Sequence, residues 1–306
     1  MRISKSFWAA TAFSCGLLAS IAGASAAECK NPKQLVFSII PTEETTQELG
    51  IYKPLLDRLK KNTGKKIEFF MPTSYASVIE GMINGWVHIG VHGPNSYVVA
   101  KQKDPKLEVF ATYAKKPGHL QEEGPGYRAV LIVRAGSKFK DIASLKGSVL
   151  GLADPASTSG NLMPRVVFGE TIKVGTDLEK YFSKVVYTGG HDLSTLAVKE
   201  GRVDAAFVAT HRFDNVIDRK LAKMSDFRVL WKSQFIPQDP FVYRGDLCPQ
   251  IKEAIVKTFL SLHEDPATKP FLAKIKSNRF VAMKDSDYDI IRKLDAAKRA
   301  RKPAKK

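Results

Sequence analysis

The sequence predicts an α/β protein with two lobes, each built on a mostly parallel sheet flanked by helices. Two observations support this prediction. Strand-like and helix-like segments alternate between residues 35 and 232, and such alternation is typical of parallel sheets covered by helices on both faces. Removal of an N-terminal export signal leaves about 280 residues, more than a single hydrophobic core commonly organises.

The individual elements follow from hydrophobic spacing and stop signals. Residues 35–41 form an apolar, strand-like run, and residues 45–61 carry apolar side chains at helical spacing before the stop signal Asn62-Thr63-Gly64. The elements expected after this helix are a strand at 67–71, a helix at 75–84, strands at 87–91, 127–134 and 148–152, a helix at 162–171, a strand at 185–187, a helix at 192–200, and strands at 203–208 and 227–232.

The N-terminus has the pattern of a secretory signal peptide, predicted to span residues 1–26. Arg2 and Lys5 precede an apolar, small-residue stretch at 7–22, and Ala24-Ser25-Ala26 provides a cleavage site. No later run approaches the roughly 18 to 20 apolar residues that a membrane span requires. The mature protein is therefore expected to be soluble and exported to the periplasm.

Three cysteines bear on the export prediction. Cys15 lies in the signal peptide and leaves with it, so Cys29 and Cys248 remain. In an oxidising compartment a structural disulfide between them is the default expectation. The alternative is two unpaired cysteines, because sequence alone does not show whether the two approach each other.

The chain is strongly basic, with a formal net charge of +17 that falls by two, to +15, when Arg2 and Lys5 are removed. Such a charge favours anionic ligands. Part of it lies in a basic tail at 298–306, which is expected to be solvated. Nucleic-acid binding is not expected, because the chain is exported and has no interleaved aromatic-basic strand or recognition-helix pattern.

A cluster of hydroxyl residues is the most informative segment. Ser157, Thr158, Ser159 and Gly160 follow the apolar strand at 148–152 and precede a helix. A helix N-terminus offers unpaired N–H groups and a partial positive charge, so this cluster favours an oxyanion site. The alternative is that these residues only cap the helix.

Further polar residues follow other expected strands, and in open α/β sheets ligands bind beyond the carboxyl ends of strands. These residues are Tyr75, His92, Tyr97, His191 and Asp239. Their common position at strand ends supports a single site between the lobes.

Several of these segments together resemble the PhnD-like family, the periplasmic receptors of phosphate, phosphite and phosphonate ABC transporters. The segments run in unbroken order between residues 35 and 262, and they are 126–134, 154–160 with Pro164, Gly190-His191, and Ile236-Pro237-x-Asp239-Pro240 after Trp231-Lys232-Ser233. The resemblance implies a type II-like periplasmic-binding-protein fold joined by hinge strands. The expected ranges are 27–127 for the first part of lobe 1, 128–234 for lobe 2, and 235–297 for the return to lobe 1.

The resemblance also implies roles for single residues. The hydroxyls of residues 157–159 would hold the oxyanion, His191 would donate from the same lobe, and Tyr75 would close the site from the opposite lobe together with the loop from His92 to Tyr97. Asp239 would accept a hydrogen bond from a P–OH or an ammonium group.

Two departures from the family pattern concern selectivity. Thr210-His211 stands where aminoalkylphosphonate receptors carry a Glu, and His92 stands where they carry a Tyr. Because an imidazole in place of a carboxylate removes an ammonium partner, an aminoethyl substituent is disfavoured. His211 is therefore expected in the ligand pocket.

The function expected from these features is that of a monomeric receptor that binds a small phosphorus oxyanion and presents it to an ABC permease in the inner membrane. No zinc-like spacing, P-loop or Gly-x-Ser-x-Gly elbow is found, so neither an enzyme, nor a cofactor, nor a metal site is predicted. Two rivals remain. One is a receptor for a carboxylate or a sulfur oxyanion. The other is an exported phosphate-ester hydrolase with Ser157 or Thr158 as nucleophile.

Overall fold

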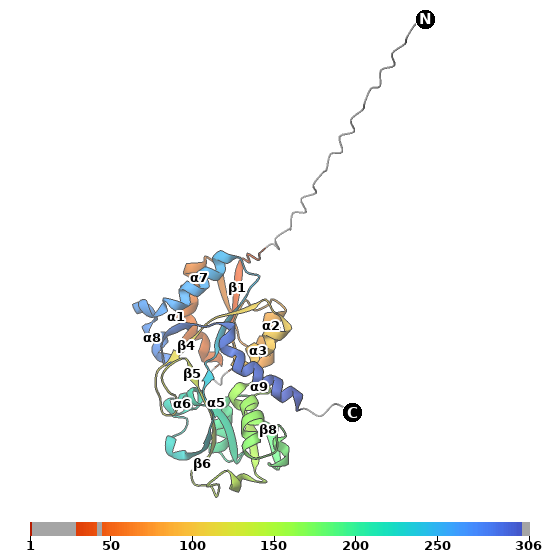
Figure 1. The fold of residues 1–306 in the computed structure, drawn as a ribbon. Coiled ribbons are helices and arrows are strands. Elements are labelled where there is room, and N and C mark those ends of the chain that lie inside the picture. The colour runs from red at the N-terminus through yellow and green to blue at the C-terminus, as the bar shows by residue number, and fades with distance from the viewer. Residues whose placement is uncertain (2–28, 42–44, 302–306) are drawn as a thin grey trace.

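The computed structural model describes residue 1, residues 29–41 and residues 45–301. In this part the chain forms two lobes that are joined by crossing segments (Figure 1). Residues 2–26 of the predicted signal peptide and residues 302–306 of the predicted basic tail lie outside the described residues. Within the described ranges, no helix has both the length and the apolar character needed to cross a membrane.

Lobe 1 is built on a six-stranded sheet with the order β13-β4-β12-β3-β1-β2. Its strands are β1 (Gln34–Ile39), β2 (Lys66–Phe70), β3 (Ile89–Val91), β4 (Leu107–Lys115), β12 (Pro240–Arg244) and β13 (Ser277–Ala282). β1 pairs parallel with β2 and β3, whereas β12 and β13 pair antiparallel with their neighbours. The sheet is thus mixed rather than mostly parallel, because the chain re-enters the lobe through β12 in the opposite direction.

Helices cover both faces of this sheet. The helices of lobe 1 are α1 (Thr45–Thr63), α2 (Tyr75–Ile83), α3 (Pro94–Lys103), α7 (Pro249–Leu260), α8 (Lys269–Lys274) and α9 (Asp289–Ala300). Side chains alternate between the faces along β12, as a strand requires. Phe241 joins the aromatic core with Phe259 and Phe280, and Val242 joins the second core beneath α3.

Lobe 2 is built on a five-stranded sheet with the order β10-β6-β9-β7-β8. Its elements are β6 (Ala129–Arg134), β7 (Val149–Leu152), α4 (Gly169–Thr171), β8 (Lys184–Tyr187), α5 (His191–Lys199), β9 (Ala205–Ala209), α6 (Thr210–Asp218) and β10 (Phe227–Lys232). β7 pairs parallel with β8 and β9, and β6 pairs antiparallel with β9 and β10. This sheet too is mixed. β9 is buried along its whole length, with Ala206 facing the core under α5 and α6, and Phe207 facing the other core.

The lobes are connected by two crossings and bridged by one helix. β5 (Gly126–Tyr127) pairs antiparallel with β11 (Ile236–Pro237) between the two sheets. The last helix, α9, packs against α3 of lobe 1 and against the turn Thr158–Leu162 of lobe 2, as Figure 1 shows. Arg301, directly beyond α9, forms an ion pair with Glu170 of lobe 2.

Two segments differ from the sequence-based expectation. The loop expected from His92 to Tyr97 is instead the start of α3, because Pro94 suits the first helical turn and Gly93 precedes it as the N-cap residue. The helix expected at 162–171 begins earlier, as π-helical turns at Thr158–Leu162 and Pro164–Phe168. Cys29 and Cys248 form a disulfide that ties the N-terminal segment to the start of α7.

Candidate functional site

The three adjacent hydroxyl residues lie in the turn after β7, at the interface of the lobes. Ser157 is the N-cap residue of the π-helical turn Thr158–Leu162, and its Oγ accepts a hydrogen bond from the N–H of Gly160 at 3.1 Å. Ser157, Thr158 and Ser159 are each at most 1% exposed. The segment therefore does both things that its composition suggested: it caps a helical turn, and it places three hydroxyls at the N-terminal end of that turn.

Gly160 lies where the turn packs closely against its neighbours in lobe 2. A Cβ atom at this position would lie 2.4 Å from the Cβ of Ala153 and 2.9 Å from Cε1 of His191. Both distances are too short for any side chain. Gly160 therefore allows the turn to approach β7 and His191 closely, and in this way it supports the site without needing to contact a ligand.

His191 begins α5 and joins the hydroxyl turn. Its Nε2 lies 3.2 Å from Ser157 Oγ and 3.3 Å from Ser159 Oγ, and its Nδ1 accepts a hydrogen bond from the N–H of Ala209 at 3.2 Å. Burial lowers the pKa of His191 to about 3, and the nearby Arg212 adds to this effect. When Nδ1 accepts the bond from Ala209, the proton of the neutral ring is on Nε2, which then donates toward the hydroxyls.

Two tyrosines cover the hydroxyl turn. Tyr75, the first residue of α2 in lobe 1, lies beside the hydroxyl of Ser157, and Tyr127 of β5 lies beside the hydroxyls of Thr158 and Ser159. Burial raises the pKa of both phenols well above the ordinary value, so both remain protonated. We name these residues the hydroxyl cradle: Ser157, Thr158, Ser159, His191, Tyr75 and Tyr127. None of its members carries a formal charge at neutral pH.

The lobes are closed around this cradle. The backbone N–H of Asn95, at the N-terminal end of α3, donates to Thr158 Oγ1 at 2.8 Å, and its side-chain Nδ2 donates to the carbonyl of Ala156 at 3.0 Å. Two helical N-termini, one from each lobe, thus approach Thr158. An anion at this point would face the positive ends of both.

Two predicted site residues lie elsewhere, which corrects the expectation for each. His92 is fully buried within lobe 1, where its Nδ1 lies 3.3 Å from Ser96 Oγ and its Nε2 lies 3.1 Å from Met82 Sδ. Tyr97 points away from the cradle, since its hydroxyl donates to Asp285 and its ring packs against Tyr288. Tyr97 lies in α3, whose helical backbone turns its side chain into the core of lobe 1. His92 lies between β3 and α3, and its ring contacts Met82 of α2 and Ser96 of α3.

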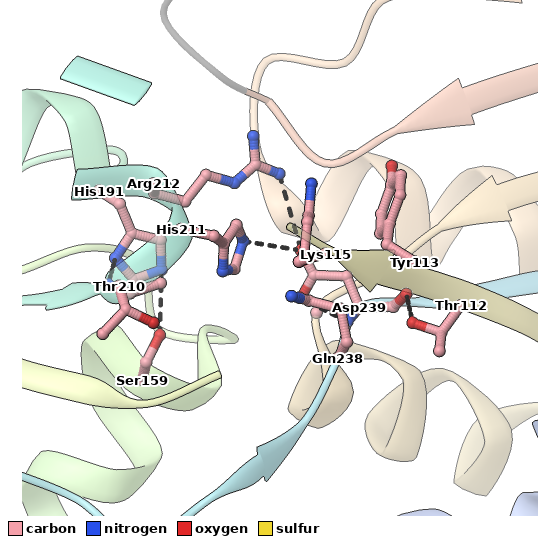
Figure 2. Close-up of polar contacts among 12 residues, drawn as sticks. Thr112, Tyr113, Lys115, Ser159, His191, Thr210, His211, Arg212, Gln238 and Asp239 are labelled. Atoms are coloured by element: carbon pink, nitrogen blue, oxygen red, sulfur yellow. Dashed lines mark hydrogen bonds and ion pairs between the residues drawn. The ribbon is translucent and has the colours of Figure 1, made fainter. Parts of the chain in front are cut away.

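Asp239 lies at the opposite side of the cleft, with residues of lobe 2 facing it. Its Oδ2 is 3.6 Å from His211 Nε2 and 3.7 Å from Arg212 Nη2 (Figure 2). Burial raises the pKa of Asp239, but His211 and the charges of Arg212 and Lys115 outweigh burial and hold this pKa below its ordinary value. Burial lowers the pKa of His211 to about 4, although Asp239 opposes the shift. At neutral pH the carboxylate is therefore charged and the imidazole is neutral.

A cavity adjoins Asp239 between the lobes. It is lined by Ile51, Tyr52, Tyr113, Lys115, Asp192, His211, Arg212, Asn215, Asp218, Arg219, Asp239, Lys274, Ile275 and Lys276. A neighbouring cavity at the mouth of the cleft, lined by Tyr75 and His191 among others, shares Asp192 and Arg212 with it. We name the first of these the charged cavity. Figure 2 shows His211 between His191 of the cradle and Asp239.

Three residues of the site were missed by the sequence analysis. Arg212 directly follows His211 at the start of α6, but its side chain is recognisable as part of the cleft only once Asp239 is placed opposite. Lys115 ends β4, a strand that was not predicted, and Tyr127 was identified only as part of a crossing segment. The sequence holds one signal for two of these residues. Lys115 and Tyr127 lie at the two ends of the segment by which the chain leaves lobe 1.

Comparison with protein families gives a match over most of the chain. Residues 37–288 match the family model described as "ABC transporter, phosphonate, periplasmic substrate-binding protein". The matched range includes the hydroxyl cradle, Asp239 and every residue that lines the charged cavity.

Individual relatives and a solved structure agree with this match. The chain is 31% identical over 267 residues to the phosphonates-binding periplasmic protein of Escherichia coli (strain K12), covering 86% of this chain and 76% of that protein. It is 29% identical over 279 residues to the phosphate-import protein PhnD of Mycolicibacterium smegmatis, covering 85% and 84%. A binding protein component of an ABC phosphonate transporter from Pseudomonas aeruginosa has a similar crystal structure, with a TM-score of 0.79 and 28% identity over 88% of this chain and 87% of that one.

Proposed function

Because the chain belongs to the family of periplasmic substrate-binding proteins of phosphonate ABC transporters, we propose that it captures a small phosphorus oxyanion in the hydroxyl cradle. The lobes close over the ligand, and the closed protein presents it to an ABC permease in the inner membrane. Export through the signal peptide at 1–26 and a monomeric state belong to the same proposal.

One observation carries this proposal above the others. The hydroxyls of Ser157 and Ser159 meet the Nε2 of His191 at the N-terminal end of a buried helical turn, and the hydroxyl of Thr158 lies in the same turn. Tetrahedral oxyanions present several acceptor oxygens, and hydroxyl and N–H donors at a helix N-terminus satisfy them without a cation. A neutral imidazole and protonated phenols complete this set of donors.

Closure is part of the proposed mechanism. The contacts of Tyr75 with Ser157, and of Asn95 with Thr158, join residues of different lobes. β5 and β11 contribute only two residues each where the chain crosses, so a change of their backbone angles would let the lobes separate. A bound oxyanion would favour the closed state because it receives hydrogen bonds from both lobes.

Phosphate-ester hydrolysis is not the proposed function, although Ser157 and His191 lie within hydrogen-bond distance. A general base must offer a lone pair to the nucleophile. The bond from the N–H of Ala209 to Nδ1 leaves the ring proton on Nε2, which is the nitrogen that faces Ser157. A ring whose pKa is lowered to about 3 is also a weak base.

Titration calorimetry of the mature protein against phosphate, phosphite, methylphosphonate, aminoethylphosphonate, sulfate and acetate tests the proposal. We expect at least one phosphorus oxyanion to bind about tenfold more tightly than sulfate, a difference of about 1.4 kcal/mol. Tighter binding of sulfate or acetate would instead support the rival receptor for another oxyanion.

A further inference from the structure

We propose that the charged cavity binds a second acidic group of the ligand, so that the preferred substrate is a phosphonocarboxylate, a phosphonate whose short carbon chain ends in a carboxylate. This inference rests on the proposed function, because it places the phosphorus group in the hydroxyl cradle. The two cavities of the cleft share Asp192 and Arg212 and therefore adjoin each other, and Tyr75 and His191 of the cradle line the second of them.

The carboxylates that line the charged cavity already have cationic partners. Asp239 faces Arg212 at 3.7 Å, Asp192 faces Arg219 at 3.9 Å, and Asp218 forms an ion pair with Lys276. An ammonium substituent would therefore compete with a cation that the protein itself supplies. A ligand substituent that enters this cavity is expected to pair with a positive side chain that has no carboxylate partner.

Lys115 is that group. Its ammonium donates to the carbonyl of Ile275 at 2.8 Å and lies 4.2 Å from the ring centroid of Tyr113, and both partners are uncharged. In the part of the chain that the structure describes, no carboxylate lies within ion-pair distance of its Nζ. Lys115 is only 8% exposed. A buried ammonium without a counterion is costly, so an anion that enters the cavity would gain from pairing with it.

His211 provides a second, independent observation. Its side chain lines the charged cavity and the residue is 6% exposed, yet its Nδ1 has no hydrogen-bond partner among the described residues. A group of a bound ligand would supply the partner that this buried polar atom lacks. An entering carboxylate would favour the protonated ring, whose Nδ1–H could then donate to it while Nε2–H faces Asp239.

The charges around Asp239 disfavour an ammonium group as the substituent of the phosphonate. Around Asp239, Arg212 and the protonated form of Lys115 face one carboxylate, and His211 is neutral at pH 7 in the absence of a ligand. An aminoethyl group would add a further positive charge to this cluster. A carboxymethyl group would instead offset part of the positive charge, which favours its burial when the lobes close.

Calorimetry with phosphonoacetate, methylphosphonate and aminoethylphosphonate tests the inference. We expect the wild type to bind phosphonoacetate about tenfold more tightly than methylphosphonate, and aminoethylphosphonate more weakly than either. Lys115→Met should remove the advantage of phosphonoacetate and change the affinity for methylphosphonate by less than about threefold. Lys103→Met is the control, because Lys103 lies outside the cleft and is paired with Glu80 at the surface; it should preserve the advantage.

Two results would overturn the inference while leaving the proposed function intact. One is equal or weaker binding of phosphonoacetate than of methylphosphonate by the wild type. The other is an equal loss of both ligands in Lys115→Met, which would mean that Lys115 serves the phosphorus group itself. If the wild type binds none of the three phosphonates, nor phosphate or phosphite, the proposed function fails instead.

Proton uptake on binding gives a second readout that does not depend on the measured affinities. Burial lowers the pKa of Lys115 to about 7, with Arg212 and Lys276 acting in the same direction and Asp239 opposing them. At pH 8 most of the ammonium is therefore deprotonated, and a carboxylate beside it should draw a proton from the buffer. Calorimetry in buffers of different ionisation enthalpy should detect more proton uptake with phosphonoacetate than with methylphosphonate. The difference should shrink in Lys115→Met; an unchanged difference contradicts the role of Lys115.

Discussion

The two ends of the cleft differ in how they would recognise an anion. The hydroxyl cradle consists of neutral donors, whereas the charged cavity contains Lys115, Arg212 and Asp239 within one buried cluster. Neutral donors have fixed directions and can match the tetrahedral oxygens of a phosphorus group. Charges act with less direction and discriminate by sign. In the proposed function, the geometry of the cradle donors would select the phosphorus group, and the charges of the cavity would select its substituent.

The same two regions also differ in how they are assembled. The core of the cradle is one continuous turn, residues 157–160, to which His191 is added from α5 of the same lobe. The charged cavity is assembled from β4, α6 and the segment before β12, which are far apart in the sequence. A change in lobe position would therefore disrupt the cavity and leave most of the cradle intact.

The largest effect is expected from removing the cradle hydroxyls. The triple variant Ser157→Ala, Thr158→Ala, Ser159→Ala should lose several orders of magnitude in affinity for methylphosphonate, since each hydrogen bond to a charged group contributes about 1.5 to 3 kcal/mol. Calorimetry measures the loss, and thermal unfolding checks that the fold is retained. Thr171→Ala, on the same segment but exposed and outside the cleft, serves as the control. Unchanged affinity in the triple variant would move the site away from this turn.

The second prediction tests whether the neutral state of the histidines matters. Burial lowers the pKa of His92 and His191 to about 3 and of His211 to about 4, whereas unfolded His titrates near 6.5. Between these values the unfolded chain binds more protons, so stability is lost as the pH falls below about 6.5. At pH 5 each ring contributes a loss of up to about 2 kcal/mol.

Thermal unfolding at pH 7.5 and pH 5 measures this loss. The raised pKa values of Asp154 and Asp214 act in the opposite direction, so the comparison of variants is more informative than the wild type alone. His191→Gln should show a smaller drop in Tm between the two pH values than the wild type. His119→Gln, at a largely exposed ring, should keep the wild-type drop. Equal drops in all three proteins would argue against a role for the buried rings.

The third prediction reverses the charge preference of the cavity. His211→Glu places a second carboxylate beside Asp239 and should improve binding of aminoethylphosphonate relative to methylphosphonate by about tenfold, or about 1.4 kcal/mol. His211→Gln, which is uncharged, should leave the ratio of the two affinities near that of the wild type. A wild type that already prefers aminoethylphosphonate by tenfold would mean that His211 does not contact the substituent.

The fold was predictable from the sequence to the extent that local patterns determine it. The strands at 227–232 and 185–187, and the helix at 75–84, appear within one residue of the expected bounds, because each has a clear periodicity and a turn signal beside it. β4 and β12 were not predicted, and the sheets are mixed where mostly parallel sheets were expected. The direction of a strand after the second crossing depends on which distant strand it pairs with. The local spacing of apolar residues gives no information about that pairing.

The candidate site could likewise be predicted only where local patterns in the sequence place its residues. Ser157, Thr158, Ser159 and His191 were identified because a turn after a strand brings neighbours in sequence together in space. Tyr97 was misplaced because the start of α3 was taken for a loop. His92 was misplaced because a position just after a strand does not show that the ring is buried within lobe 1. Arg212 was missed because its proximity to Asp239 arises only when the two lobes close. Lys115 was missed because it meets Asp239 only through the pairing of β4 with β12 within lobe 1.

The smallest effect is expected at the contact between the lobes. Tyr75 is the residue of lobe 1 that reaches Ser157, and its protonated phenol can donate to a ligand oxygen only when the lobes are closed. Tyr75→Phe keeps the ring and removes one hydroxyl, so methylphosphonate should bind less tightly by about 1 kcal/mol, or roughly fivefold. Tyr187→Phe is the control, because its hydroxyl donates to Asn161 of lobe 2 and makes no contact across the cleft. Calorimetry of both variants separates two interpretations. A loss confined to Tyr75→Phe supports recognition of the oxyanion from both lobes, whereas equal affinities in both variants would place all recognition in lobe 2 and leave lobe 1 as a cover.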